Sequence, residues 1–370
     1  MSTDTALIEK REELKRRLAV GEYKTLVDIF LRWFDHLIRK FTRRSKPLPM
    51  WFITLLLCLV VISVSNIATG RNLTQTIKLH GLVPVLAVNL LNILNIASLV
   101  ILNQSIRGIF TLWRDDILDA TDSITSLEEF ENWLRLTCNW RLHFFVTISG
   151  GILNGLNLMT ITPLPDVYTS YGWIFSIVIT AFLISMFISA FLYLFLMFIL
   201  LSARMHRYNL KLFAAAPSNS ELVSLLSGKF SYFLYFVAVF AAVSTLISAW
   251  GGFMPSFAIN LVLFLWLPII AIFVLNQTSL SSVIRRAKWK TLNEAQAKVE
   301  KIRASKNFGN QETMDAIKRL MDYHDRVKAT RDSALDFRTY LSFINSLLLP
   351  LLAFILGNLD LVLKFFGRQP

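Results

Sequence analysis

The chain has 370 residues, of which 54% are hydrophobic and only 17% are charged, and its formal net charge is +13. Soluble domains have about 45–50% apolar and about 25% charged residues. The composition and the mean hydropathy of +0.52 therefore exclude an ordinary soluble protein and indicate an integral membrane protein.

Seven long apolar runs carry almost no charge. Most have the roughly 20 residues that a helix needs to cross about 30 Å of hydrocarbon, and apolar runs of this length satisfy their backbone groups as helices. In chain order they are Met50–Asn66, Leu82–Asn103, His143–Pro163, Gly172–Ser202, Phe230–Gly252, Pro255–Asn276 and Thr339–Phe365. The sequence predicts an all-α, polytopic membrane helical bundle of about seven transmembrane helices.

The positive charge is concentrated between alternate runs. With the N-terminus inside, 34 of the 38 Lys and Arg residues fall in the cytoplasmic parts, which predicts an N-in, C-out topology in a cell or bacterial inner membrane. A nucleic-acid partner is not predicted, because no recognition motif accompanies the charge. Four regions follow: a basic region 1–49, a six-helix membrane bundle 50–276 with cytoplasmic connections 104–142 and 203–229, a cytoplasmic helical extension 277–338, and a seventh membrane helix with a short tail, 339–370.

The N-terminal region predicts one helix over residues 5–46. Its apolar positions recur at helical spacing and are Leu26, Phe30, Trp33, Leu37 and Phe41, widened by Val27, Phe34 and Ile38. A basic cluster follows, made of Arg39, Lys40, Arg43, Arg44 and Lys46. Such a helix suits an anionic leaflet and equally suits packing on other cytoplasmic helices.

The other two cytoplasmic parts have opposite characters. The connection 104–142 is acidic and carries Trp113, Trp133 and Trp140. It is expected either to pack on the basic regions or to form a solvated hairpin. Residues 279–306 and 311–332 predict two helices separated by the breaker NFGNQ. Since these helices are mostly polar, we expect an extension of the bundle and no independent domain.

Polar and small residues share one face of the second and third runs. In the second run, Asn89, Asn92, Asn95 and Asn103 fall within a wedge about 120° wide at helical spacing. In the third run, Gly151, Asn154 and Gly155 lie on one face, and the two glycines form a GxxxG pattern that permits close helix approach. The asparagines are expected to hold the second helix against the third. A wetted pathway lined by neutral polar groups is the alternative.

The seventh run has a similar stripe, formed by Ser342, Asn345, Ser346 and Asp360. Pro350 removes a backbone donor and Gly357 adds flexibility, so both are candidate hinges. These features favour a bending, pore-lining helix. Asp360 would place a carboxylate near the outer mouth, or would simply pair with Lys364 one turn away.

The residues give no sign of an enzyme, a cofactor or a metal site. No phosphate-binding loop, zinc motif or nucleophile elbow is present. The histidines have no metal-ligand spacing, and His143 and His206 at run ends are expected to cap or to snorkel. Acidic or basic residues that would mark proton coupling are missing from the first six runs.

One segment resembles a known family. Thr339 and Tyr340 are followed by LSFIN and then by Ser346 and Leu347. The pattern resembles the last helix of insect gustatory receptor channels, which carries Thr-Tyr, five apolar residues and Gln-Phe. The resemblance implies a seven-span, N-inside tetramer like the insect odorant and gustatory receptors, with a pore lined by the last helix. Ser346 and Leu347 depart from Gln-Phe, and the chain beyond them is longer than usual there.

Taken together, the sequence predicts an oligomeric ion channel or pore-forming protein that is assembled or gated through cytoplasmic helices. The expected partners are the lipid bilayer, further copies of the chain, and small ions or solutes. The alternatives are a facilitative solute transporter and a non-conducting membrane anchor or signalling scaffold.

Overall fold

A computed structural model describes residues 3–43, 46–68, 82–161, 171–250, 266–304 and 311–333. Within these ranges the chain forms helices and no β-strand, with one isolated bridge between Thr121 and Leu210. The all-α prediction is confirmed for this part of the chain.

The helices are connected mostly by short segments. They are α1 (Thr3–Val20), α2 (Leu26–Thr42), α3 (Met50–Ala68), α5 (Leu82–Leu112), the π-helix η1 (Trp113–Ile117), α6 (Ile124–Thr137), α7 (Trp140–Ile161), α8 (Tyr171–Arg204), the 3₁₀ turns η2 (Met205–Arg207) and η3 (Pro217–Asn219), α9 (Glu221–Trp250), α11 (Leu267–Ala304) and α12 (Gln311–Ala329).

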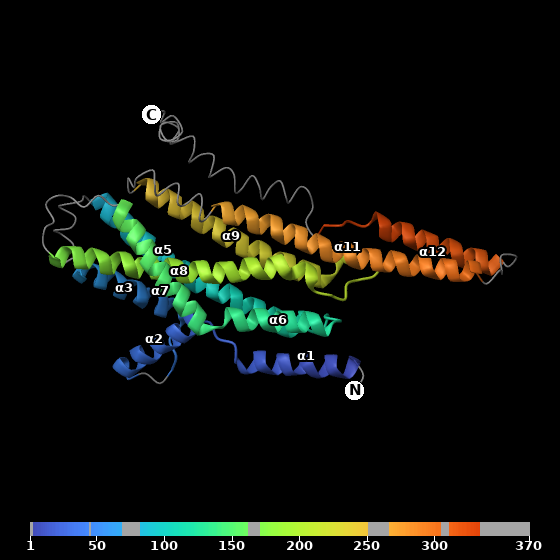
Figure 1. Cartoon of the computed structure of the whole chain (residues 1–370), viewed down its shortest axis with the longest axis horizontal. Coiled ribbons are helices and arrows are strands. Elements are labelled where there is room, and N and C mark those ends of the chain that lie inside the picture. Colours follow the sequence, from blue (N-terminus) through green and yellow to red (C-terminus); the bar gives the residue numbers. More distant parts are fainter. Residues whose placement is uncertain are drawn as a thin grey trace, which may run out of the picture.

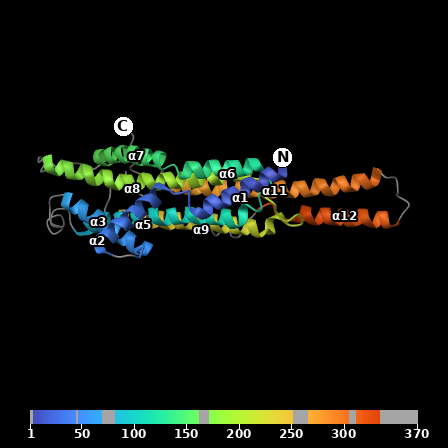
Figure 2. The same cartoon turned by 90° about the horizontal axis from the view of Figure 1, so that it is seen from below.

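The molecule is elongated, with most apolar helices at one end and the charged hairpin of α11 and α12 at the other (Figures 1 and 2). The apolar helices α3, α5, α7, α8 and α9 gather at one end, together with the start of α11. At the other end, α11 and α12 form a long hairpin that extends beyond the bundle. Helices α1 and α6 lie near the middle of the molecule.

Among the described residues, three helical segments are long and apolar enough to cross a membrane: Val85–Ile117, Ser185–Arg207 and Glu221–Ser248. Met50–Ser63 is a shorter apolar helix. These segments are consistent with a membrane location.

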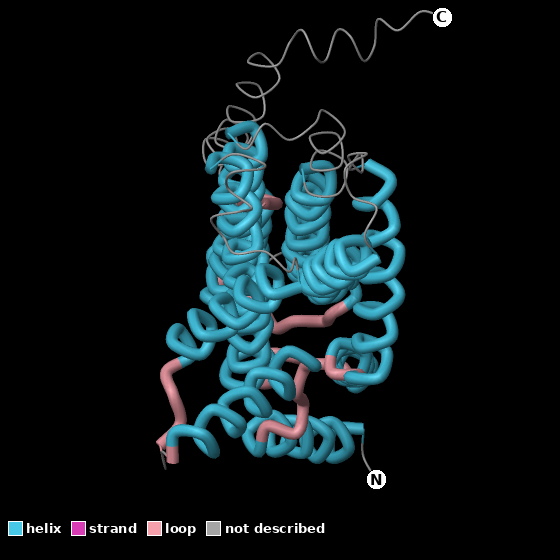
Figure 3. The backbone as a smooth tube through the Cα atoms, turned by 90° about the vertical axis from the view of Figure 1, so that its left-hand side faces the viewer, coloured by secondary structure: helices cyan, strands magenta, loops and turns pink. Residues whose placement is uncertain are grey.

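Helix α8 is the central packing partner. Figure 3 shows the helices viewed along the long axis of the molecule. Helix α8 contacts α7 most extensively and also α5, α11 and α3. Its aromatic side chains stack on α9, where the rings of Phe198 and Phe233 have centroids 3.5 Å apart. Because α8 is apolar on all sides, it can be enclosed by neighbours in this way.

The prediction of one helix over residues 5–46 is wrong. Helix α1 ends at Val20, and Gly21 adopts a left-handed conformation with φ of 69°. Gly21 and Glu22 donate backbone hydrogen bonds to Leu18 and Arg17, the pattern that ends helices at glycine. A second helix then starts at a capping box in which Thr25 and Asp28 bond to each other's backbone.

The helical extension agrees with the prediction for its described part. Helix α11 continues without a break from its apolar start to Ala304, over 38 residues, and α12 then runs back along it. The charged half of α11 is therefore a direct continuation of an apolar helix.

Candidate functional site

Asn103 lies in a buried polar network between α5 and α2. Its amide donates to the Asp28 carboxylate at 2.8 Å and accepts from the Thr25 hydroxyl at 2.6 Å. Arg107, one turn further along α5, lies 3.5 Å from the same carboxylate. Thr25, Asp28 and Asn103 are at most 2% exposed, so the network fixes the start of α2 on α5.

The partner of the α5 asparagines therefore differs from the predicted one. Helix α5 packs mainly on α8, α9 and α3, whereas α7 packs on α8. Asn89 bonds to its own helix at the Val85 carbonyl, and the Asn95 carbonyl accepts from Ser98. Asn92 is buried. The face of α5 that carries the asparagines is turned towards protein. Near the C-terminal end of this long helix, however, the partner of Asn103 is the start of α2.

The glycines of α7 mark a close crossing with α8. A Cβ atom at Gly151 would lie 2.9 Å from Met186 Cγ, and one at Gly150 would lie 2.5 Å from Ser189 Oγ. Gly151 thus lies at a helix contact, while the surroundings of Asn154 and Gly155 are outside the described part. The GxxxG pattern did not single out Gly150, which is the tighter of the two positions.

Glu131 on α6 is the centre of an ion-pair cluster with α1. Its carboxylate lies 2.6 Å from Lys10 Nζ and 2.7 Å from Arg17 Nη1, and it accepts from Arg135 at 2.7 Å. Arg17 also forms a bidentate ion pair with the Glu22 carboxylate. The acidic connection therefore packs on the N-terminal region, which is one of the two basic regions that the first alternative names.

Burial and charge act in opposite directions on Glu131. Desolvation is the largest effect and raises its pKa, but hydrogen bonds from Lys10, Arg135 and Arg17 together outweigh it and lower the pKa to about 2. The carboxylate is consequently ionised at neutral pH, although its side chain is only 5% exposed. Three cations around one buried carboxylate make this contact depend on its charge.

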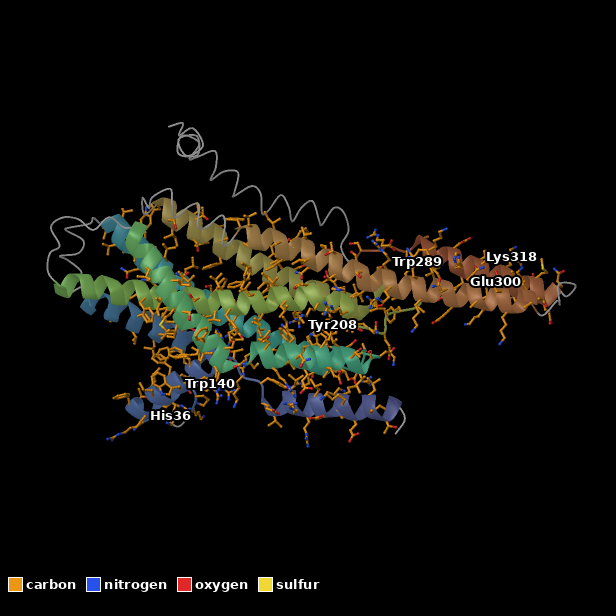
Figure 4. The ribbon with its side chains drawn as sticks, viewed as in Figure 1. His36, Trp140, Tyr208, Trp289, Glu300 and Lys318 are labelled. Atoms are coloured by element: carbon orange, nitrogen blue, oxygen red, sulfur yellow. The ribbon has the colours of Figure 1, made fainter. Side chains whose placement is uncertain are left out.

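Aromatic residues of the connection 104–142 form the core of this layer. The rings of Trp113 and Phe130 stack at 3.7 Å, and Tyr208 meets Trp113 edge-on at 5.0 Å. Trp133 donates to the Met197 carbonyl of α8. These contacts tie α6 to α8; Figure 4 labels Tyr208 at this position.

Helix α2 has three different sides. Val27, Leu31 and Phe34 are buried against the bundle. The aromatic residues Phe30, Trp33 and Phe41 are exposed, and the cations Arg32, Lys40 and Arg43 are also exposed. One side of α2 therefore packs on protein and two sides are uncovered, while the contact with an anionic leaflet stays a prediction.

The basic cluster after α2 is only partly described. Arg39 pairs with Asp35 at 3.0 Å, and Asp35 also accepts from the Leu48 backbone. Lys40, Arg43 and Lys46 are exposed. Arg44 is outside the described residues.

Lys288 joins the two arms of the hairpin at its base. Its buried ammonium group donates to the Thr330 carbonyl at 2.7 Å and to the Asp332 carboxylate at 2.8 Å. Lys288 thereby holds the end of α12 beside the middle of α11. An open groove of about 640 Å³ lies on the neighbouring face of α11, where Ser281, Arg285 and Trp289 are among the lining residues.

The two histidines at run ends behave differently. His206 contacts the Ala203 carbonyl at 2.7 Å, which is the expected capping role. The expectation is wrong for His143, which is fully buried and stacks on Tyr193 at 4.2 Å. Within the described residues, no three His, Cys, Asp or Glu side chains are grouped to hold a metal ion.

The candidate pore residues cannot be placed in the structure. Ser342, Asn345, Ser346 and Asp360 lie outside the described residues, as do the candidate hinges Pro350 and Gly357.

No protein-family model matches the chain, and no curated protein or solved structure matches it significantly. The resemblance in the last run therefore stays limited to Thr339, Tyr340 and the arrangement of spans.

Proposed function

We propose that the chain is a multi-pass membrane protein that forms an oligomeric ion channel or pore. In this proposal seven helices span the bilayer, the N-terminus is cytoplasmic, and the charged helices assemble and gate the protein. The proposal assigns it no catalytic activity, cofactor or nucleic-acid partner. Three candidate spans among the described residues support this placement, as does the concentration of 34 of 38 cationic residues in the N-terminal region and between alternate runs.

The observation that carries the proposal is the α11–α12 hairpin. At about 1.5 Å per residue, the 38 residues of α11 measure roughly 57 Å, whereas a membrane crossing needs about 20 residues. The helix therefore extends far into the cytoplasm in the proposed topology. The hairpin then returns the chain to Lys288, near the middle of α11, seven residues before the last apolar run starts at Thr339.

This geometry supports a gating role for the hairpin. Because Lys288 clamps Thr330 and Asp332, a displacement of the hairpin is transmitted to the segment that carries the polar stripe. Ser342 and Asn345 follow Asp332 by 10 and 13 residues in the sequence. A pore-lining helix attached in this way can respond to events in the cytoplasm.

The surface of the hairpin supports assembly between copies. Met314 and Met321 of α12 are 50% and 39% exposed, and Trp289 of α11 is 57% exposed. Methionine and tryptophan are enriched at the cores of protein interfaces, where they provide adaptable apolar area. An exposed apolar surface on an otherwise polar hairpin suits contact with a second copy.

The mass of the purified full-length protein in detergent tests this assembly. We expect a multiple of the chain mass of 42.4 kDa, and we expect Met314→Lys with Met321→Lys to shift the population towards the monomer. The control, Gln311→Lys with Asp315→Asn, makes the same charge change at exposed polar positions of α12 and should leave the mass unchanged. A monomeric wild type would contradict the proposal, and identical masses for the two double variants would remove the hairpin from the assembly contact.

A further inference from the structure

The uncovered surface of α2 divides into an aromatic side and a cationic side. At about 100° per residue, Phe30, Trp33 and Phe41 fall on one side of the helix, and they are 37%, 56% and 81% exposed. Arg32 and Arg43 lie on the adjacent side, and Lys40 lies at the border between the two. This is the arrangement of a helix that lies in a membrane interface, with an apolar side towards acyl chains and cations beside it.

The cations on this surface are free to meet an anionic partner. Within the described part of the chain, Arg32, Lys40 and Arg43 are exposed and form no ion pair. The acidic residues of α2, Asp28 and Asp35, are instead buried on the protein side, where they bond to Asn103 and to the Leu48 backbone. The acidic side chains of α2 are therefore absent from its exposed surface, where the cations lie.

The rotation of α2 about its axis is fixed. Asp28 and Asp35 are two turns apart and are both anchored to the rest of the protein. These two anchors prevent the helix from rolling, so Trp33 and Lys40 cannot turn inwards without breaking buried hydrogen bonds. The exposed surface is a fixed feature of the fold.

The position of α2 is at the start of the apolar end of the molecule. Only seven residues separate its last residue from α3, and α2 contacts α3, α5 and α7. Trp51 and Trp140, in the first turns of α3 and α7, are 69% and 50% exposed. Figure 4 labels Trp140 on α7, which contacts α2. Exposed tryptophans at helix ends are typical of a membrane–water interface.

From these observations we infer that α2 docks on the anionic cytoplasmic leaflet, with Phe30, Trp33 and Phe41 among the acyl chains and Arg32, Lys40 and Arg43 at the lipid phosphates. The inference rests on the proposed membrane placement and is independent of conduction. Charge complementarity selects this partner, because an apolar surface alone would suit neutral lipid equally well, while the unpaired cations favour anionic headgroups.

Lipid-specific quenching of a fluorophore tests the inference. The full-length protein, with Cys58→Ala and Cys138→Ala, is labelled at Trp33→Cys and reconstituted into nanodiscs. Quenching is compared between brominated phosphatidylserine and brominated phosphatidylcholine at equal bromine content. A second label at Leu246→Cys on α9, which is 68% exposed, reports contact with lipid away from the cations.

We expect both lipids to quench the α2 label, with phosphatidylserine about twofold more effective and with an advantage that decreases at high salt. Arg32→Gln, Lys40→Gln and Arg43→Gln together should remove the advantage. Lys298→Gln, Lys318→Gln and Arg319→Gln, which remove the same charge from exposed positions of the hairpin, should preserve it.

Equal quenching by the two lipids at α2 would overturn the inference, as would quenching at Leu246→Cys with none at Trp33→Cys. Loss of quenching at both positions would overturn the membrane placement itself and with it the proposed function.

Discussion

Asn103 links two helices that are far apart in the sequence. The clustering of asparagines on one face of an apolar run indicated that these side chains avoid lipid, and Asn92 and Asn103 are indeed buried. The partner could not be predicted, because periodicity gives the direction of a face but not the neighbouring helix. Thr25 and Asp28 belong to a capping box whose own sequence signal is local, and only the fold brings Asn103 to it.

Gly150 gives the sharpest prediction at the residue scale. We expect Gly150→Ala to destabilise the protein by about 1–3 kcal/mol, because its Cβ would lie 2.5 Å from Ser189 Oγ and 2.9 Å from Ser189 Cβ. The short serine side chain cannot move away without separating α7 from α8. The measurement is the midpoint of thermal unfolding in detergent.

Gly228 provides the matched control. It is also inside a helix, α9, but a Cβ there would meet nothing within 4 Å. Gly228→Ala should therefore stabilise the protein by about 0.5–1 kcal/mol, since alanine restricts the unfolded chain and favours the helix. Equal effects of the two substitutions would show that α7 and α8 are not in close contact.

At the scale of elements, helix positions were more predictable than helix ends and partners. One helix was predicted over residues 5–46, but the left-handed conformation of Gly21 ends α1 and lets α2 turn onto α5. The acidic character of 104–142 correctly indicated a contact with the basic N-terminal region. Glu131 itself could not be singled out among seven acidic residues, because burial depends on packing.

The contact between α1 and α6 should depend on pH through Glu131. Its pKa is about 2 in the folded protein and 4.5 without interactions. The charged form is therefore favoured by folding: the stabilisation is fully present above about pH 4.5 and is lost as the pH falls towards 2. We expect α1 to separate from α6 in this range. The distance between spin labels at the exposed positions Glu9 and Asn132, measured by pulsed electron–electron double resonance, tests this.

Substitution separates Glu131 from general acid effects. Glu131→Gln should broaden the Glu9–Asn132 distance already at neutral pH, because breaking a buried ion pair costs about 3–5 kcal/mol and leaves Lys10 and Arg17 without their partner. Glu128→Gln, at an exposed position on the same helix, should keep the narrow distance. A distance that is independent of both pH and Glu131 would mean that the aromatic core alone holds this layer.

At the scale of the whole molecule, the charge distribution predicts the topology. An impermeant thiol reagent added outside intact cells should label a cysteine at Thr74, in the first loop, and should not label one at Gln296, which is exposed on α11. Labelling after permeabilisation confirms that Gln296 is accessible. The opposite pattern would reverse the orientation of the protein and would place the α2 surface and the hairpin outside.

The general architecture could be predicted from composition and periodicity, because apolar length and charge placement are properties of the chain itself. The continuous length of α11 was not predicted, because its apolar run and residues 279–306 were expected as separate helices. The clamp at Lys288 could not be predicted, because one lysine among 14 cationic residues of region 277–338 carries no pattern that distinguishes it. The last apolar run, with Asn345 and Asp360, stays a prediction.

Conductance of the reconstituted protein tests the central claim most directly. In planar bilayers we expect the wild type to conduct, Asn345→Leu to reduce the conductance, and Asp360→Asn to reduce selectivity for cations at the outer mouth. The control is Asn89→Leu, the same substitution at an asparagine whose side chain bonds to its own helix. This variant should conduct like the wild type. Solute flux without conductance would indicate a transporter. The absence of both ionic current and solute flux with correctly inserted wild-type protein would contradict the channel and favour a scaffold.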